Sequence, residues 1–311
     1  MRRMAHWRLR SRTLELGRRT LVMGVVNITP DSFSDGGLFL ASEKAIDHAL
    51  RLIGEGADIV DLGAESTRPG SRAGGTSANL HPAVSAEEEQ ERLLPVLEGI
   101  LKSLPHAVIS VDTYKAETAC AALRAGAQIV NDVSGFTWDS AIACVCAEFH
   151  AGVVLSHARG RPDGWRAQPQ LAPDALMATV REGLATSLAA AERAGIPFDS
   201  IVLDPGYGFG KRFDENYVVL SRQAELLSLG RPLLAGLSRK SFLGHTLSPL
   251  FGGEPAPVAA RENASLAAMT VAILHGASIV RMHAVHPAVE AARIADAILE
   301  PVHREPDGDA E

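Results

Sequence analysis

The sequence predicts a (β/α)8 barrel, the TIM-barrel fold, preceded by a short N-terminal β-hairpin. Short β-branched or apolar runs, each bounded by Gly, Asp or Asn, alternate with longer Ala-, Leu- and Glu-rich segments of helical spacing. Eight such units occur in a chain of 311 residues. That number and that length suit a closed barrel, and an open doubly wound sheet is the alternative.

The expected strands and helices follow one another along the chain. The strands are the apolar runs at residues 21–26, 59–62, 107–111, 128–131, 152–155, 201–203, 232–235 and 278–281. The helices are the segments in which apolar residues recur every three or four positions: 42–54, 85–101, 115–125, 140–149, 173–194, 215–228, 258–275 and 287–298.

The N-terminal segment precedes the first barrel strand. Residues 6–16 place the alternating pairs Trp7 with Leu9 and Leu14 with Leu16 on either side of a polar turn. This pattern predicts a hairpin that closes the bottom of the barrel. We divide the chain into this hairpin at 1–20, the barrel at 21–300 and a polar, acidic tail at 301–311 that we expect to be disordered.

Composition restricts the class of protein. With 46% hydrophobic residues the chain can bury a large core in one domain. A net charge of −7 gives no overall basic field, so we expect no nucleic-acid partner. No segment approaches the roughly 18 apolar residues of a membrane span, and no apolar stretch follows the N-terminal arginines. We expect a soluble, cytoplasmic protein, with Cys120, Cys144 and Cys146 in the core or half-buried.

Polar residues stand at the ends of most of the expected strands. In a (β/α)8 barrel the carboxyl ends of the strands form one rim, and enzymes of this fold carry their active sites there. A single Asp or Asn at the rim can be structural, because buried strand ends need their backbone groups satisfied. Four rim residues together offer acceptors, donors and a cation, the complement of a planar heterocycle with amidine-like edges: Asp112, Asn131, Asp204 and Lys240.

A second group of rim residues is suited to an anion. Arg68 follows the second strand, and Arg281 and His283 lie at the end of the eighth. Arginine forks suit phosphate oxygens, and the amide oxygen of Asn27 suits a magnesium ion that keeps most of its waters. The group predicts a phosphate or pyrophosphate with Mg²⁺. Solvated arginines paired with nearby carboxylates are the alternative.

Two loops and one glycine-rich run complete the predicted site. The loops after the first and second strands are long, and such loops are costly to order unless they act as lids. Their apolar residues Phe33 and Pro69 would cover a bound substrate. The run GYGFGK at 206–211 has neither dinucleotide nor Walker spacing, so we interpret it as a tight turn that lets the backbone approach a ligand.

With these residues the chain resembles the dihydropteroate synthase family. The similar segments are MGVVNITPDSFSDGG at 23–37, DLGAESTRPG at 61–70, SVDT at 110–113, VND at 130–132, DPGYGFGK at 204–211, GLSRKS at 236–241 and RMH at 281–283. They occur in order at nearly every strand end. The resemblance implies a cytoplasmic homodimer that joins a pterin pyrophosphate to p-aminobenzoate in folate synthesis and is a sulfonamide target.

The resemblance also implies roles for individual residues. Asp112, Asn131, Asp204 and Lys240 would hold the pterin, with Arg281 stacking on its face. Thr67, Arg68, Arg281 and His283 would bind the pyrophosphate, Asn27 the Mg²⁺, and Phe33, Pro69, Phe209, Lys240 and Ser241 the p-aminobenzoate. The catalytic residues would be Asp35, Asp112, Lys240 and Arg281, with the two carboxylates stabilising a transient cation at the pterin methylene.

The chain departs from the family pattern in two places. Many members have Met-His-Met-x-Gly after the fifth strand, where this chain has SHARG at 156–160. The change removes bulky thioethers near the pterin and is expected to add a cation, Arg159. After the eighth strand Ala284 replaces a common Asp, whose loss we expect to loosen His283 or a neighbouring arginine.

Two other functions remain as alternatives. A pterin-dependent methyltransferase shares the Asp, Asn and Asp ring but should not need the Ser-Arg-Lys, Thr-Arg-Pro and Arg-x-His segments together. A non-catalytic pterin-binding paralogue is suggested by the altered loop after the fifth strand. The retained Asn27, Asp35 and Arg68 favour the synthase over a binding protein, which would not need them.

Overall fold

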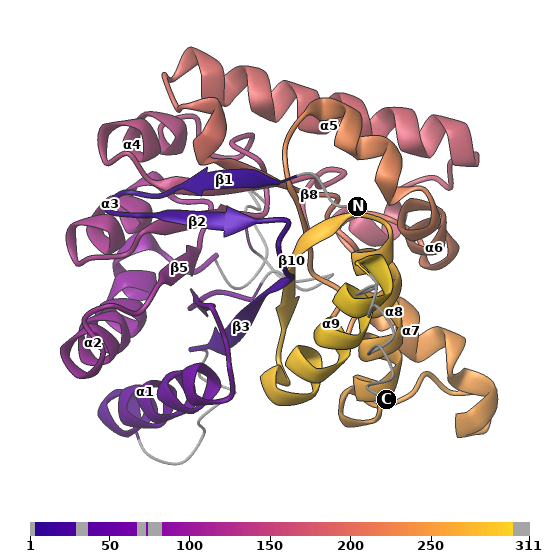
Figure 1. Ribbon diagram of the computed structural model, residues 1–311, viewed down its shortest axis with the longest axis horizontal. Coiled ribbons are helices and arrows are strands. Elements are labelled where there is room, and N and C mark those ends of the chain that lie inside the picture. Colours follow the sequence, from indigo (N-terminus) through magenta and orange to yellow (C-terminus); the bar gives the residue numbers. More distant parts are fainter. Residues whose placement is uncertain (1–3, 29–36, 67–72, 74–82, 301–311) are drawn as a thin grey trace, which may run out of the picture.

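The computed structural model describes residues 4–28, 37–66, 73 and 83–300. Parallel strands close into a barrel in the order β10-β3-β4-β5-β6-β7-β8-β9, and helices surround it (Figure 1). The predicted (β/α)8 barrel is therefore confirmed, and the open sheet is wrong. In the part of the chain that is described, no helix is long and apolar enough to cross a membrane.

The barrel strands lie within two residues of their predicted positions. They are β3 Leu21–Asn27, β4 Ile59–Gly63, β5 Ile109–Asp112, β6 Ile129–Asp132, β7 Gly152–Ser156, β8 Ile201–Asp204, β9 Leu233–Ala235 and β10 Ala277–Met282. Almost every residue in them is buried, because helices cover the outside and side chains fill the inside.

The helices that follow the strands agree with the prediction in number and order, although α1 begins five residues earlier than predicted and further differences occur late in the chain. They are α1 Gly37–Gly54, α2 Ala86–Ser103, α3 Ala116–Arg124, α4 Ile142–Glu148, α5 Pro173–Arg193, α6 Phe213–Ser221, α8 Glu262–Leu274 and α9 Val285–Leu299. A short extra helix, α7 Ser241–Thr246, was not predicted, since six residues including Gly244 carry little helical signal.

Buried polar contacts explain why one predicted helix is divided. The segment 215–228 becomes α6 and a 3-10 helix, η4 Gln223–Leu229. The buried Gln223 amide accepts a bond from Tyr207 (2.7 Å) and donates to the carbonyls of Ala272 (3.0 Å) and His275 (3.2 Å). These long-range bonds hold the chain at the point where α6 ends.

The core has two parts, inside the barrel and between the barrel and its helices. Inside, residues of the strands and Val108, which directly precedes β5, form a layer with the hairpin residues Trp7, Leu9 and Leu16. This layer includes Met23, Ile59, Val108, Ile129, Val154, Val202, Leu234 and Ile279. Because side chains alternate along a strand, the residues two and four positions further on also face the barrel interior.

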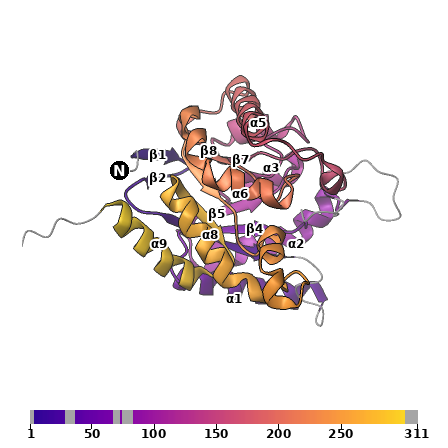
Figure 2. The same cartoon turned by 90° about the vertical axis from the view of Figure 1, so that its right-hand side faces the viewer.

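The N-terminal hairpin covers the amino-terminal end of the barrel. Strands β1 Ala5–Arg8 and β2 Thr13–Leu16 pair antiparallel, and Figure 2 shows them at one end of the molecule. The Trp7 indole is fully buried and donates to the carbonyl of Ser200 (2.9 Å). The hairpin therefore closes the end of the barrel opposite to the strand carboxyl termini.

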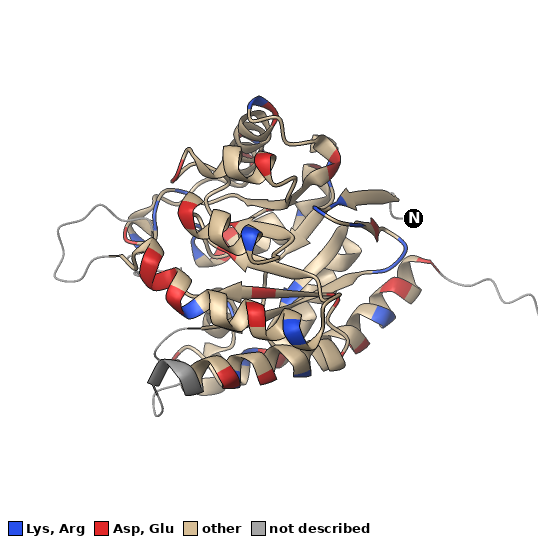
Figure 3. Ribbon diagram, turned by 90° about the vertical axis from the view of Figure 1, so that its left-hand side faces the viewer, with Lys and Arg blue, Asp and Glu red and all other residues tan. Residues whose placement is uncertain are grey.

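The surface carries interspersed charges of both signs. Figure 3 shows both basic and acidic residues on the outer helices. Of the three cysteines, Cys146 is buried, Cys120 is half-buried and Cys144 is exposed, so the expectation for Cys144 was wrong.

Candidate active site

Residues of four barrel strands meet in a network of charged and amide groups. Arg281 of β10 donates to Asp61 of β4 (Nε to Oδ2, 2.6 Å) and to Asp112 of β5 (Nη2 to Oδ2, 2.7 Å). Asn131 of β6 donates from Nδ2 to the same Asp61 oxygen (3.1 Å). The side chains face one another because each lies two residues beyond an inward-facing position of its strand. The structure thus brings Asp112, Asn131 and Arg281 together, as predicted.

Burial and charge set the protonation of this network. Burial raises the pKa of Asp112 to about 7, against the opposing positive charge of Arg281. Burial alone would lower the pKa of Arg281, but Asp61 and Asp112 raise it, so the guanidinium stays charged. The site therefore contains a permanent cation next to a carboxyl group that titrates near neutral pH.

Asp204 and Lys240 form the neighbouring part of the rim. Asp204 ends β8, is buried, and accepts from the Gly206 amide (2.7 Å). Lys240 lies five residues after the end of β9, and its ammonium stands 3.8 Å from the centroid of the Phe209 ring. Burial lowers the pKa of Lys240 to about 8, with Asp204 opposing the shift. Among the described residues Lys240 forms no ion pair, so it is available to a ligand.

Asn27 and His283 lie side by side at the ends of β3 and β10. Asn27 Nδ2 and His283 Nε2 are 3.5 Å apart, and Asn27 is exposed. The other ring nitrogen, His283 Nδ1, is 2.9 Å from the Ser238 hydroxyl, which also accepts from the His283 amide (3.2 Å). Ser238 therefore orients His283, and replacement of the neighbouring Asp by Ala284 does not leave the ring loose, contrary to our expectation.

The glycine-rich run is a tight turn, as predicted. Gly206 has a φ of +71°, and a Cβ there would lie 1.9 Å from the His157 carbonyl oxygen, so only glycine fits. Lys211 turns back into the run and donates to the carbonyls of His157 (3.0 Å) and Gly206 (2.8 Å). These bonds fix the conformation of the run, which includes Phe209. Ser241 is exposed at the start of α7.

The altered loop after β7 does not add a free cation to the pterin side of the site. Arg159 is buried and donates from Nη1 to both carboxylate oxygens of Glu215 (3.1 and 3.2 Å). Glu215 neutralises the charge, so our expectation of an added cation was wrong. Ser156 and Ala158, in place of two methionines, leave shorter side chains at this position.

Five of the predicted site residues lie outside the described residues: Phe33, Asp35, Thr67, Arg68 and Pro69. The base of the loop that carries Arg68 is described. Glu65 bonds to Lys115 (2.5 Å) and accepts from the Val84 amide (3.3 Å), and Lys115 bonds to the buried Glu89 (3.0 Å). Glu65, near the start of the loop, thus connects the Val84 amide near its end to the half-buried Lys115.

Two residues of the site were missed among the sequence candidates. Asp61 is fully buried and binds both Arg281 and Asn131, and its Oδ1 has no hydrogen-bond partner among the described residues. Ser238 orients His283. Asp61 had a detectable signal, since it is a polar residue at an inward-facing position of its strand, as Asp112 and Asn131 are. Ser238 had none, because its contact with His283 joins residues 45 positions apart in the sequence.

Comparison with known proteins agrees with this geometry. The family described as "Pterin binding enzyme" matches residues 23–283. The chain is 40% identical to the dihydropteroate synthase of Bacillus subtilis over 92% of this chain and 91% of that protein. A Clostridium difficile dihydropteroate synthase in the presence of pteroic acid has a TM-score of 0.79 and 40% identity, covering 91% of this chain and 98% of that one.

A second solved structure is similar to the same extent. The Xanthomonas albilineans dihydropteroate synthase with 4-aminobenzoic acid has a TM-score of 0.82 and 38% identity, and the match covers 96% of this chain and 99% of that one. The chain therefore belongs to the family of pterin-binding enzymes. Within that family it belongs with the dihydropteroate synthases, which are transferases.

Proposed function

We propose that the chain condenses 6-hydroxymethyl-7,8-dihydropterin pyrophosphate with p-aminobenzoate, giving 7,8-dihydropteroate and pyrophosphate. The observation that carries this proposal is the convergence of Asp112, Asn131 and Arg281 in one hydrogen-bonded network on the barrel rim. Support also comes from the similar synthases, whose structures contain pteroic acid or 4-aminobenzoic acid.

The pterin fits the polar part of the rim. Its amide and amino groups are donors that suit the carboxylates of Asp112 and Asp204, while its carbonyl oxygen suits the Lys240 ammonium. Asn131, already bonded to Asp61 through Nδ2, has its amide oxygen left to accept. Asp61 and Asp112 accept hydrogen bonds from the nitrogens at the edge of the Arg281 guanidinium. This arrangement suits stacking of the guanidinium plane on the pterin face.

The pyrophosphate belongs on the cationic side, with Thr67, Arg68, Arg281 and His283. Asn27 fits a magnesium ion as a single neutral oxygen ligand, because Mg²⁺ takes its other ligands from water and phosphate oxygens. No group of three His, Cys, Asp or Glu suited to a metal occurs among the described residues. When bound, Mg²⁺ would neutralise charge on the leaving pyrophosphate.

The reaction breaks the bond between the pterin methylene carbon and the pyrophosphate oxygen and forms a bond from that carbon to the amine nitrogen. The arginines lower the cost of charge on the departing oxygen, and the carboxylates of Asp35 and Asp112 stabilise positive charge at the methylene. The amine then loses one proton to solvent. No covalent enzyme intermediate is required, and Lys240 and Arg281 act by holding the pterin in place.

p-Aminobenzoate fits the part of the rim next to Lys240. Phe209 offers an aromatic ring there, Ser241 an exposed hydroxyl, and Phe33 and Pro69 belong to the same proposed pocket. This pocket is also the proposed site of sulfonamide competition, since a similar Yersinia pestis synthase has been solved as a sulfonamide drug complex.

A homodimer in the cytoplasm completes the proposal. The last helices expose apolar residues suited to a symmetric contact, among them Val271 (38% exposed) and Ile298 (59% exposed). Light scattering on the purified protein tests the oligomeric state, and a monomer at micromolar concentration would contradict it.

The test of the activity is pyrophosphate release by the purified full-length chain with the pterin pyrophosphate and Mg²⁺, with and without p-aminobenzoate. We expect release that depends on p-aminobenzoate and equals the dihydropteroate formed. Pterin binding without turnover would instead indicate the non-catalytic paralogue.

A further inference from the structure

The loop after β7 lies directly against the glycine-rich run 206–211. The Arg159 amide donates to the Phe209 carbonyl (3.3 Å), and Lys211 donates to the carbonyls of His157 (3.0 Å) and Phe209 (3.4 Å). A Cβ at Gly210 would lie 2.5 Å from the Arg159 carbonyl oxygen. The two loops therefore touch backbone to backbone, and a shift of one must move the other.

The same loop supplies an aromatic contact to Phe209. The rings of Trp165 and Phe209 have centroids 5.2 Å apart and planes inclined by 37°. Trp165 is buried, and its indole nitrogen donates to the Gly160 carbonyl (3.1 Å), which fixes the orientation of the indole. Phe209 is thus contacted by Trp165 as well as by the Lys240 ammonium.

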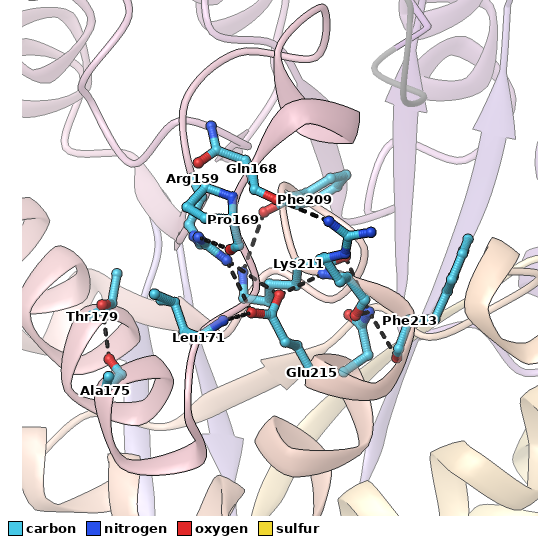
Figure 4. A network of polar contacts seen from close by, with 12 residues as sticks. Arg159, Gln168, Pro169, Leu171, Ala175, Thr179, Phe209, Lys211, Phe213 and Glu215 are labelled. Carbon is cyan, nitrogen blue, oxygen red and sulfur yellow. Dashed lines mark hydrogen bonds and ion pairs between the residues drawn. The ribbon is translucent and has the colours of Figure 1, made fainter.

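A buried ion pair joins this loop to α6. Arg159 and Glu215 are 7% and 2% exposed in their side chains. Arg159 Nη2 donates to the Pro169 carbonyl (2.8 Å), and Glu215 accepts from the amides of Leu171 (2.7 Å) and Arg212 (2.5 Å). Figure 4 shows these groups converging from three segments of the chain. Removing one partner would leave a buried charge unpaired, so the pair restrains all three segments.

Glu215 also restrains the far end of the glycine-rich run. Its bond to the Arg212 amide caps the start of α6, directly after Lys211. Asn216, next along the helix, accepts from the Gly208 amide (2.7 Å). The run that presents Phe209 is consequently held on one side by Arg159 and Trp165 and on the other by the first turn of α6.

We propose that Arg159, Glu215 and Trp165 are positioning residues that set Phe209 against Lys240, and so determine how well the site takes the aromatic amine. The inference rests on the proposed function, which places Phe209 in the p-aminobenzoate pocket. It concerns residues of this chain that lie outside the pterin and pyrophosphate positions. Arg159 itself occupies the unspecified position of the Met-His-Met-x-Gly pattern.

The experiment compares steady-state constants of the full chain carrying Arg159→Gln, Glu215→Gln, Trp165→Leu, Trp165→Phe or Phe209→Ala. The matched control is Arg222→Gln, which removes an exposed pair with Asp174 and Glu225 at the other end of α6. We expect Arg159→Gln, Glu215→Gln and Trp165→Leu to raise the KM for p-aminobenzoate about five- to tenfold. The KM for the pterin pyrophosphate should change less than about twofold. Trp165→Phe, which keeps an aromatic ring against Phe209, should leave the KM for p-aminobenzoate close to that of wild type, and the control should match wild type.

The outcomes separate this inference from the proposed function. A raised KM for p-aminobenzoate in Phe209→Ala, but not in Arg159→Gln or Trp165→Leu, overturns the inference and leaves the function intact. If the positioning variants lose kcat to the same extent while both KM values stay unchanged, the residues are purely structural, and this result also overturns the inference. If Arg159→Gln does not fold, the KM values of Trp165→Leu test the inference, because that variant leaves the ion pair intact. A wild-type chain without turnover overturns the proposed function itself.

Discussion

At the residue scale, Lys240 and Asp204 combine burial with charge and have few partners. Asp204 accepts a hydrogen bond from one backbone amide, and burial raises its pKa. The Lys240 ammonium lies over the Phe209 ring and forms no ion pair among the described residues. Buried charged groups with few partners contribute most to the free energy of binding a polar ligand, because the free energy cost of burying them is already present in the free protein.

We therefore expect Lys240→Ala and Asp204→Asn to weaken pterin binding by about 1 to 3 kcal/mol, which corresponds to roughly fivefold to 150-fold in the dissociation constant. Titration calorimetry with the pterin measures this change. Lys102→Ala, an exposed lysine on α2, is the control and should bind as wild type does. Unchanged affinity in both site variants would refute the pterin assignment.

The pKa values of two rim residues predict a narrow pH optimum. Burial raises the pKa of Asp112 to about 7 and lowers that of Lys240 to about 8. Asp112 must be ionised to accept and Lys240 protonated to donate. The kcat/KM for the pterin pyrophosphate should rise with pH up to about 7 and fall above about 8. Because arginine stays protonated, Lys240→Arg should remove the alkaline decline in whatever activity it retains. A flat wild-type profile from pH 6 to 9 would count against both assignments.

At the scale of elements, the loop after β4 depends on a buried cluster at its base. Lys115 lies between Glu65 and Glu89, whose side chains are 6% and 1% exposed. Thr118 of α3 donates to Glu89 (2.7 Å), and Arg92 of α2 donates to the Ala64 carbonyl (3.1 Å). One ammonium thus links α2 and α3 to the residues that lead into the Thr67 and Arg68 segment.

Lys115→Met should lower the free energy of unfolding by about 3 to 5 kcal/mol at pH 8, because it leaves two buried carboxylates facing each other. Burial already raises the pKa of Glu89. In the variant Glu89 should take up a proton more easily still, so the loss should shrink as the pH falls towards 5. Urea unfolding at the two pH values measures both effects, with Lys102→Met on α2 as the control. An equal loss at both would indicate lost packing rather than unpaired charge.

At the scale of the whole molecule, stability and function lie at opposite ends of the barrel. The hairpin and the innermost layer fill the amino-terminal end, and the polar network occupies the carboxyl-terminal rim. This division is general in (β/α)8 enzymes, where the two ends of the strands have separate roles.

We expect Trp7→Ala to cost about 3 to 5 kcal/mol of stability, because it removes a fully buried indole from the hairpin. Trp7→Phe should cost less, chiefly the bond to the Ser200 carbonyl. Thermal unfolding measures the loss, and kcat at low temperature should stay within about twofold of wild type per folded molecule. A kcat that falls in proportion to stability would show that the two ends are coupled.

The chain's own pattern determined the elements and the rim residues, because both are local signals. Alternation within strands, helical spacing and a polar residue after each strand are readable in a few residues, and their repetition eight times leaves a barrel as the simplest arrangement. Asp112, Asn131 and Arg281 could be predicted as site residues on that ground alone, and the family resemblance added the identity of the ligands.

Only the tertiary structure decided which charges face one another. Arg281 meets Asp61 across 220 positions of sequence, Arg159 meets Glu215 across 56, and Ser238 meets His283 across 45. No local pattern encodes such pairs, since they depend on where the closed barrel places each strand end and loop. For that reason the sequence predicted Arg159 as an added cation, whereas in the folded protein its charge is neutralised by Glu215 and its loop packs against Phe209.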